Sequence, residues 1–288
     1  MGIYPASLKC DIIYKEVVNM INSSMAKLSP ECLSLVQGTA HTLIAGTTGS
    51  GKSVLLNSIL YSLYKLHLIT FNSRRPLFVF VDTKRVELKE YKNSALTLAY
   101  VTEPEDVPDH LDTVIEMMDL RYELMEGKTS DDSPIHVVID ELADLLDTPG
   151  VLERIIKIGR LGRAANIHLL CCTQDPSRRT LSAQLMQNFT TCVALRCRDQ
   201  IESKQIIRMP GAEDLPRHGK AIVCDSEGSR VINIPMIPDG DIAVAISTMD
   251  DMFEHFSKKN AGEFLTCSDE LARKIEGHTL AEAAGVLV

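Results

Sequence analysis

The sequence predicts an α/β protein with a mostly parallel sheet and helices on both of its faces. Apolar runs of strand length alternate along the chain with longer amphipathic segments, and each run is apolar almost continuously. A continuous apolar run indicates a strand buried on both faces, which is typical of a parallel sheet between two layers of helices. Hydrophobic residues make up 45% of the 288 residues and aromatic residues only 5%, so we expect a sizeable, aliphatic core.

The predicted elements follow one another in an alternating order. Strands are predicted at residues 41–45, 76–82, 135–140, 167–173, 191–196 and 220–224. Amphipathic helices are predicted at residues 11–25, 52–65, 107–126, 150–165 and 239–259. Pro30 and Gly38 are expected to end the first helical segment. We therefore divide the chain into an N-terminal helical segment (1–38), an α/β domain (39–238) and a C-terminal helical tail (239–288).

Charge is distributed unevenly along the chain. The net charge of −9 argues against nonspecific nucleic-acid binding by the whole surface. Residues 151–230, however, contain 13 Lys and Arg against 8 Asp and Glu, whereas the rest contains 17 against 31. The basic segment is either a focused binding surface or a set of charges that pair locally or stay solvated, and charge alone favours the second interpretation.

Membrane, targeting and zinc signals are absent from the sequence. No apolar run reaches the roughly 18 residues of a transmembrane helix, and the first ten residues do not read as a signal peptide. We expect a cytoplasmic protein, or one recruited to a membrane by another component. The eight cysteines include no C-x-x-C pair, so no zinc site is expected. Cys171 and Cys172 lie in an apolar run and are predicted to be reduced core residues rather than catalytic thiols.

A phosphate-binding loop is predicted between the first strand and the helix that follows it. The pattern G-x-x-x-x-G-K-[ST] is matched, and glycines let the amides approach phosphate oxygens as an anion nest. We expect Lys52 to neutralise the β- and γ-phosphates of ATP and the Ser53 hydroxyl to bind Mg²⁺. The alternative is a glycine-rich turn that matches by chance. The expected nucleotide-binding residues are Gly46, Thr47, Thr48, Gly49, Ser50, Gly51, Lys52, Ser53 and Val54.

Two adjacent acids end the predicted strand at 135–140. In a phosphate-loop protein, Asp140 is expected to hold hydrated Mg²⁺ and Glu141 to activate the attacking water as a general base. The alternative is a strand end that simply reaches solvent. Gln174 follows the next apolar strand, where it is expected to orient water near the γ-phosphate or, alternatively, to cap a turn.

Two groups of basic residues suggest contacts outside the nucleotide pocket. Lys157, Arg160 and Arg163 are spaced by three residues and should share a helix face, so Arg163 is a candidate for a neighbouring subunit's γ-phosphate. A solvated basic face is the alternative. Arg178 and Arg179 are predicted in a loop off the sheet, where they contact a nucleic-acid backbone or form an exposed turn.

Several blocks together resemble the motor domain of the FtsK/SpoIIIE family of DNA translocases. They occur in the family's order over roughly residues 38–236. The blocks are His41-Thr-Leu-Ile-Ala-Gly-Thr-Thr-Gly-Ser-Gly-Lys-Ser-Val, Val81-Asp-Thr-Lys84 with Glu87-Leu88 and Tyr91, Arg121-Tyr-Glu-Leu-Met, Val138-Ile-Asp-Glu-Leu-Ala-Asp-Leu-Leu, Arg163-Ala-Ala-Asn-Ile-His-Leu, Cys172-Thr-Gln-Asp-Pro-Ser and Gly211-Ala-Glu-Asp-Leu.

The resemblance implies a RecA-like ATPase core that assembles as a ring, usually a hexamer, around double-stranded DNA. ATP would lie between subunits, with Arg163, or second Arg160, acting on the neighbour's nucleotide. The segment at 178–180 matches a family segment that faces the DNA channel. Lys84 matches a family position whose role the sequence does not explain.

The chain departs from the family pattern in several places. Asp175 stands where the family usually has Arg, the segment before the core is short, and residues after 238 do not resemble a winged-helix domain. These departures suggest a compact motor of a plasmid, phage or conjugative element. Two alternatives remain: a secretion-type motor of the same superfamily that acts on polypeptide, and a nucleotide-dependent scaffold without useful turnover.

Overall fold

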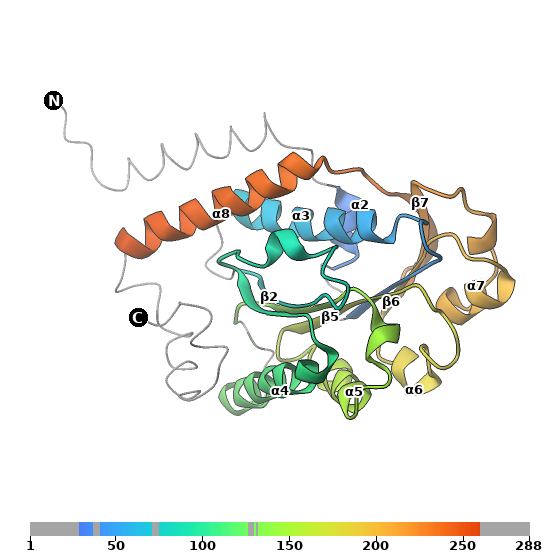
Figure 1. Cartoon of the computed structure of the whole chain (residues 1–288), viewed down its shortest axis with the longest axis horizontal. Coiled ribbons are helices and arrows are strands. Elements are labelled where there is room, and N and C mark those ends of the chain that lie inside the picture. Colours follow the sequence, from blue (N-terminus) through green and yellow to red (C-terminus); the bar gives the residue numbers. More distant parts are fainter. Residues whose placement is uncertain (1–28, 37–40, 71–74, 126–129, 131, 260–288) are drawn as a thin grey trace.

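The described residues of the computed structural model, 29–36, 41–70, 75–125, 130 and 132–259, form three layers with a sheet in the middle (Figure 1). The eight strands lie in the order β3-β2-β4-β5-β1-β6-β7-β8. All pairings from β3 to β6 are parallel, and β7 and β8 add an antiparallel edge. The predicted class, a mostly parallel α/β sheet, is therefore confirmed.

Each strand is short, as buried strands of a parallel sheet commonly are. The strands are β1 His41–Ala45, β2 Leu77–Val81, β3 Thr97–Val101, β4 Ile135–Ile139, β5 Ile167–Thr173, β6 Thr191–Ala194, β7 Lys220–Asp225 and β8 Gly228–Asn233. The α-helices are α2 Pro30–Ser34, α3 Lys52–Thr70, α4 Val107–Leu124, α5 Val151–Leu161, α6 Ala183–Met186, α7 Gln200–Ile207 and α8 Asp239–Lys259. Short 3₁₀ helices are η1 Lys89–Tyr91, η2 Pro104–Asp106, η3 Leu142–Leu145 and η4 Ala212–Asp214.

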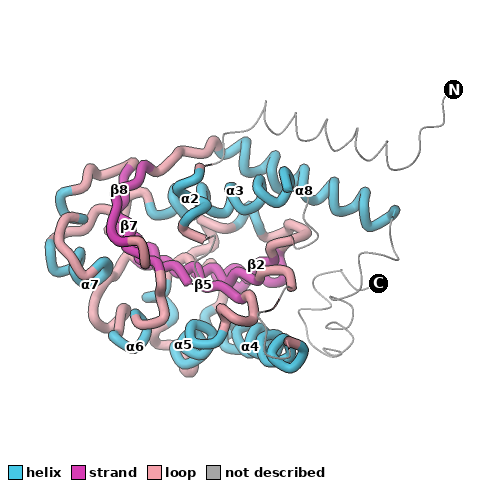
Figure 2. Tube along the Cα trace, turned by 180° about the vertical axis from the view of Figure 1, so that it is seen from behind, coloured by secondary structure: helices cyan, strands magenta, loops and turns pink. Residues whose placement is uncertain are grey.

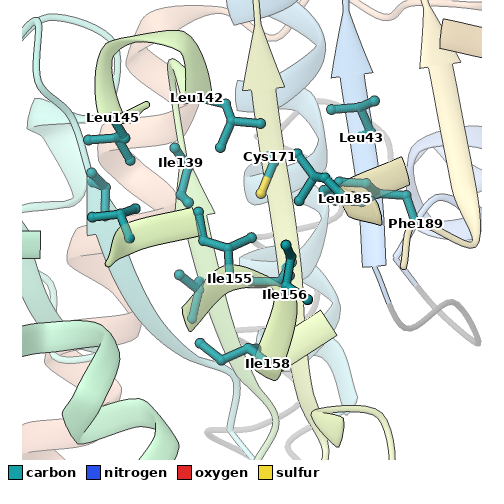
Figure 3. Packing of buried hydrophobic residues seen from close by; sticks show 14 of the residues in the cluster. Leu43, Ile139, Leu142, Leu145, Ile155, Ile156, Ile158, Cys171, Leu185 and Phe189 are labelled. Atoms are coloured by element: carbon teal, nitrogen blue, oxygen red, sulfur yellow. The ribbon is translucent and has the colours of Figure 1, made fainter. Parts of the chain in front are cut away.

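Helices cover the two faces of the sheet separately. Helices α2, α3 and α8 lie on one face, and α4, α5 and α6 lie on the other (Figures 1 and 2). Each face has its own buried apolar cluster. On the α5 side, Ile155 and Ile158 pack toward Ile139 and Cys171 of the sheet (Figure 3). β1 thus leads into a helix on one face, whereas β4 leads into a helix on the other, and such a reversal opens a crevice at the carboxyl ends of the strands.

Most predicted elements are present, with some changes of length. All six predicted strands form, and the helix predicted at 239–259 is α8 with the same bounds. The helix predicted at 52–65 continues to Thr70 as α3. Pro30 begins α2 rather than ending a segment, in the first-turn position where proline needs no hydrogen-bonded amide. The helix predicted at 11–25 lies outside the described residues.

Strands β3 and β8 and helices α6 and α7 were not predicted from the sequence. The two strands lie at the edges of the sheet, so their residues are only partly buried and lack a continuous apolar run. Helix α7 carries a signal that was available in the sequence. The Asp199 side chain accepts hydrogen bonds from the amides of Ile201 and Glu202, and Asp followed three residues later by Glu is a typical helix start.

The helix predicted at 150–165 is shorter than expected. Helix α5 ends at Leu161, and residues 162–166 form a turn closed by a hydrogen bond from the Ile167 amide to the Gly162 carbonyl. Asn166 has a left-handed backbone with φ 55°, which asparagine tolerates better than most residues. Arg163 therefore lies in this turn, and the prediction that it shares a helix face with Lys157 and Arg160 is wrong.

One buried arginine fixes this turn to the rest of the domain. Arg121 of α4 is only 2% exposed and donates to the carbonyls of Ala165 at 2.7 Å, Asn166 at 3.3 Å and Ser133 at 2.8 Å. Its neighbour Tyr122 donates to the Leu161 carbonyl at the end of α5. A buried cation with this many carbonyl partners holds the turn and the start of β5 in one position.

We expect Arg121→Met to lower the free energy of unfolding by about 3 kcal/mol, because it leaves several buried carbonyls without a donor. Urea denaturation followed by circular dichroism measures the change. Tyr122→Phe is the matched control, since it removes one hydrogen bond of a partly exposed side chain and should cost about 1 kcal/mol or less. Equal losses for the two variants would contradict this account.

Candidate functional site

The candidate site lies where three neighbouring parallel strands end. Strands β4, β5 and β1 are adjacent in the sheet and run in the same direction. The loop at 46–51 follows β1, Asp140 and Glu141 follow β4, and Gln174 follows β5. The carboxyl ends of parallel strands meet at one edge, so residues far apart in the sequence are brought together here, as the sequence analysis expected.

The glycine-rich loop has the backbone that an anion nest requires. Gly49 and Gly51 have φ of 73° and 97°, a conformation that strongly favours glycine. A Cβ on Gly46 would meet the Leu195 Cβ at 2.8 Å, so no side chain fits there. The Thr47 amide donates to the Arg196 carbonyl at 3.1 Å, which ties the loop to the segment after β6. The loop then leads directly into α3, whose N-terminus favours a bound anion.

Lys52 is a buried cation at the start of α3. It is 5% exposed, and its Nζ lies 3.1 Å from the Asp140 carbonyl oxygen and 3.4 Å from Asp140 Oδ1. Burial alone would lower the pKa of Lys52, but Cys172, Asp140 and Glu141 outweigh it and the net shift is upward. Lys52 therefore stays protonated, as a ligand for phosphate oxygens requires.

Asp140 has one carboxylate oxygen left over. The side chain is 1% exposed, Oδ1 faces Lys52, and Oδ2 has no hydrogen-bond partner among the described residues. Burial raises the pKa of Asp140, and the Lys52 charge opposes that shift. A buried oxygen without a donor is suited to a hard cation such as Mg²⁺ or to a metal-bound water. Ser53 lies in the first turn of α3, so its hydroxyl offers a second hard oxygen for the same ion.

Glu141 is buried and surrounded by donors. Oε1 accepts hydrogen bonds from Thr173 Oγ1 at 2.7 Å and from the Gln174 amide at 3.1 Å. Oε2 accepts from the Gln174 amide at 3.1 Å and from Lys84 Nζ at 3.2 Å. The side chain is only 3% exposed. Its carboxylate is thus held by β5 on one side and by the loop after β2 on the other.

Gln174 and two further residues complete the site. The Gln174 side-chain oxygen accepts from Thr48 Oγ1 at 2.7 Å, which links the end of β5 to the phosphate loop. Thr173 and Lys84 both contact Glu141, although Thr173 was not expected in the site and the sequence gave Lys84 no role. Thr173 had a signal in the sequence, because it is the one hydroxyl residue of β5 and it ends the apolar run 169–172 next to Gln174.

Arg163 does not belong to this edge of the sheet. It precedes β5, whereas the phosphate loop follows β1, and these paired parallel strands start at the opposite edge. Its side chain is exposed. His41, the first residue of β1, lies beside the same turn, because a Cβ on Gly162 would be 3.4 Å from the His41 ring. Burial lowers the pKa of His41 to about 4, and the charges of His168 and Arg163 act in the same direction. Arg160, at the exposed C-terminal end of α5, lies on the same side as Arg163.

The loop after Gln174 is organised by the residue that departs from the family pattern. Asp175 accepts hydrogen bonds from Ser177 Oγ at 3.0 Å and Thr180 Oγ1 at 2.9 Å. This closes a compact loop whose tip exposes Arg178 and Arg179. Arg179 also forms an ion pair with Asp147. Asp175 is therefore a loop-forming residue in this chain.

The other sequence expectations can be compared with the described residues. Five of the thirteen basic residues between 151 and 230 pair with acids, namely Arg154, Lys157, Arg179, Arg198 and Arg230. Cys171 and Cys172 are buried free thiols, and burial raises the pKa of Cys172 to about 12. The described part of the chain contains no cluster of three metal-binding side chains. None of its helices is both long and apolar enough to cross a membrane.

Known proteins with similar sequences belong to one family of ATPases. The model of the FtsK/SpoIIIE family matches residues 14–133. The DNA translocase FtsK of Chlorobaculum tepidum is 34% identical over 218 residues, which is 66% of this chain and 26% of that protein. The chain thus spans about a quarter of the length of this curated relative.

Two solved structures superpose on most of this chain. The pCW3 conjugation coupling protein TcpA, solved as a monomer with ATPγS, superposes with a TM-score of 0.62 at 24% identity, over 73% of this chain and 64% of that one. The cytoplasmic domain of the Type VII secretion ATPase EccC of Thermomonospora curvata gives 0.60 at 23% identity, over 73% and 28%. The chain has the fold of the P-loop ATPases, and it belongs to the FtsK/SpoIIIE family.

Proposed function

We propose that the chain is an ATPase motor that moves double-stranded DNA and hydrolyses ATP between the subunits of a ring. One observation carries the proposal beyond nucleotide binding. Lys52, Asp140 and Glu141 meet at one edge of the sheet, whereas the candidate arginine of the same chain lies at the opposite edge. A second copy would have to supply that arginine, so the complete site requires at least two chains.

ATP and Mg²⁺ are the ligands that the loop and its surroundings fit. The amides of residues 46–53 and Val54 at the start of α3 would contact the phosphates, and Lys52 would neutralise the β- and γ-phosphates. Ser53 and the unpartnered Oδ2 of Asp140 would hold the Mg²⁺. A bound Mg²⁺ held by these residues would supply positive charge to the phosphates.

Hydrolysis is assigned to the two residues at the ends of β4 and β5. Glu141 would accept a proton from the attacking water, and Gln174 would orient that water through its side-chain amide. Through the hydrogen bond from Thr48 to Gln174, a movement of the phosphate loop would also move Gln174 at the end of β5. Arg163 of an adjacent subunit, with Arg160 as the second candidate, would stabilise charge on the transferred phosphoryl group.

Double-stranded DNA is the proposed substrate. The family and the FtsK relative favour it, and the exposed loop with Arg178 and Arg179 offers contacts to the phosphate backbone. Such contacts are independent of base sequence, as movement along a duplex requires. A closed ring, a hexamer by analogy with the family, would surround the duplex and keep the motor attached.

Domain boundaries and biological setting are part of the proposal. We retain an α/β motor domain at 39–238, preceded by a helical segment at 1–38 and followed by the tail at 239–288. The first turns of α8 pack on this domain, with Ile246 and Met249 buried in the apolar cluster beside α3. Similarity to a conjugation coupling protein favours a motor of a mobile element, and we propose that this motor works in the cytoplasm.

A polypeptide substrate is the second candidate, because the fold is also that of a secretion ATPase. The two functions are separated by the ligand that stimulates hydrolysis. We expect the full chain to hydrolyse ATP faster with duplex DNA than without it, in a steady-state assay with Mg²⁺. Stimulation by a secretion-signal peptide and not by DNA would reverse the assignment, and a nucleotide-binding chain without turnover would support a scaffold.

Glu141→Gln should lower kcat by about 10²-fold or more, while ATP binding is retained, because only the proton acceptor is removed. Titration with a fluorescent ATP analogue measures the binding. Glu123→Gln changes the same charge on the exposed face of α4 and should leave both quantities unchanged. Full activity of Glu141→Gln would remove Glu141 from the mechanism.

Arg163→Ala should be nearly inactive alone, and so should Glu141→Gln, yet a mixture should regain activity. In mixed rings, roughly a quarter of the interfaces pair an intact Glu141 with an intact Arg163 from the next subunit. The ATPase rate of the mixture, compared with that of each variant, measures the recovery. A mixture as inactive as its parts would argue against a shared site. Arg160→Ala tests the second candidate in the same way.

Arg178→Ala should weaken binding to all duplex sequences alike and reduce the salt dependence by the equivalent of about one phosphate contact. Fluorescence anisotropy at several salt concentrations measures both effects. Arg178 is the better choice than Arg179, which already pairs with Asp147. Lys220→Ala, at the exposed start of β7, removes a similar charge as a control. Unchanged affinity and salt slope in Arg178→Ala would exclude this loop from the DNA contact.

A further inference from the structure

The loop that follows β2 has a rigid base and an exposed tip. Asp82 is fully buried, and its carboxylate accepts from the Leu88 amide at 3.0 Å and from Tyr100 Oη at 2.8 Å. Between these anchor points, Lys84 and Arg85 lie at the surface, followed by Val86, which is 59% exposed. The loop is therefore fixed at both ends, while the side chain of Lys84 remains free to change its partner.

Lys84 has a specific partner in the site, the Oε2 atom of Glu141. The other donors to Glu141 are the Thr173 hydroxyl, the Gln174 amide and, from the start of η3, the Ala143 amide at 3.4 Å. Two carboxylate oxygens offer about four acceptor positions. With Lys84 in place, few of them are left for a water molecule, and the position that Lys84 occupies is the one facing the exposed loop.

The contact with Lys84 is not needed to hold the Glu141 side chain at this position. The Thr173 hydroxyl and the amides of Gln174 and Ala143 also donate to Glu141, and they keep it in place when Lys84 moves away. Lys84 adds a second donor at Oε2, beside the Gln174 amide. A lone pair that already accepts from an ammonium group cannot accept a proton from water at the same time.

We propose that Lys84 is a positioning residue that restrains Glu141, so that hydrolysis is slow until the contact between Lys84 Nζ and Glu141 Oε2 is broken. This inference rests on the proposed role of Glu141 as general base. Lys84 is 42% exposed, and ion pairs with an exposed partner are weak. The restraint is thus weak enough to break in every catalytic cycle, unlike the buried bonds to Thr173 and Gln174.

The test is the steady-state ATPase of the full chain without DNA. Lys84→Met should raise kcat about two- to fivefold, the range expected for loss of one exposed ion pair, with KM for ATP unchanged. Lys84→Gln should give the same increase, and Lys84→Arg, which keeps a cation, should return the rate to the slow value. Lys89→Met removes a charge from the same segment at an exposed position and serves as the matched control.

A double variant shows whether the increase passes through Glu141. Lys84→Met combined with Glu141→Gln should be as inactive as Glu141→Gln alone. A kcat that falls or stays unchanged in Lys84→Met and Lys84→Gln, while Glu141→Gln is inactive, would overturn the restraint and leave the proposed function intact. A wild-type chain without ATPase activity would overturn both.

Discussion

The contact between Lys52 and Asp140 is the interaction on which the site depends. Both side chains are almost fully buried, and a buried charge is tolerated only when it is paired and hydrogen-bonded. The pair connects the first turn of α3 to the end of β4, so it fixes the phosphate loop against the acidic residues across the intervening strand β5. Lys52 is therefore already positioned to bind a polyphosphate.

The residues of the proposed catalytic site are divided between the two edges of the sheet. The carboxyl edge holds the loop, the acids and Gln174, whereas the turn with Arg163 lies at the amino edge. Parallel strands enforce this separation, because every strand presents its end to one edge and its start to the other. A chain of this topology cannot bring Arg163 to its own loop, and this separation is the basis of the proposal that a second copy supplies the arginine.

The strongly buried parts of the fold were predictable from the sequence, and so was the composition of the site. The apolar runs identified six strands, and the glycine pattern with Asp140 and Glu141 identified the residues that meet at one edge. The edge strands β3 and β8 were not predicted, because half-exposed strands lack a continuous apolar run. The end of α5 was misjudged because Arg163-Ala-Ala has good helix formers. The turn there is imposed by long-range bonds from Arg121, which no local pattern reveals.

Arg121 and Lys84 carry the same charge but differ in how firmly they hold their partners. Arg121 is 2% exposed and donates to three carbonyls, so moving it would leave several buried acceptors unpaired. Lys84 is 42% exposed and can exchange Glu141 for water at little cost. Burial therefore decides which cation acts as a fixed support and which can release its partner. The proposed function uses both kinds of contact: Arg121 keeps the turn that carries Arg163 in one position, whereas Lys84 can release Glu141.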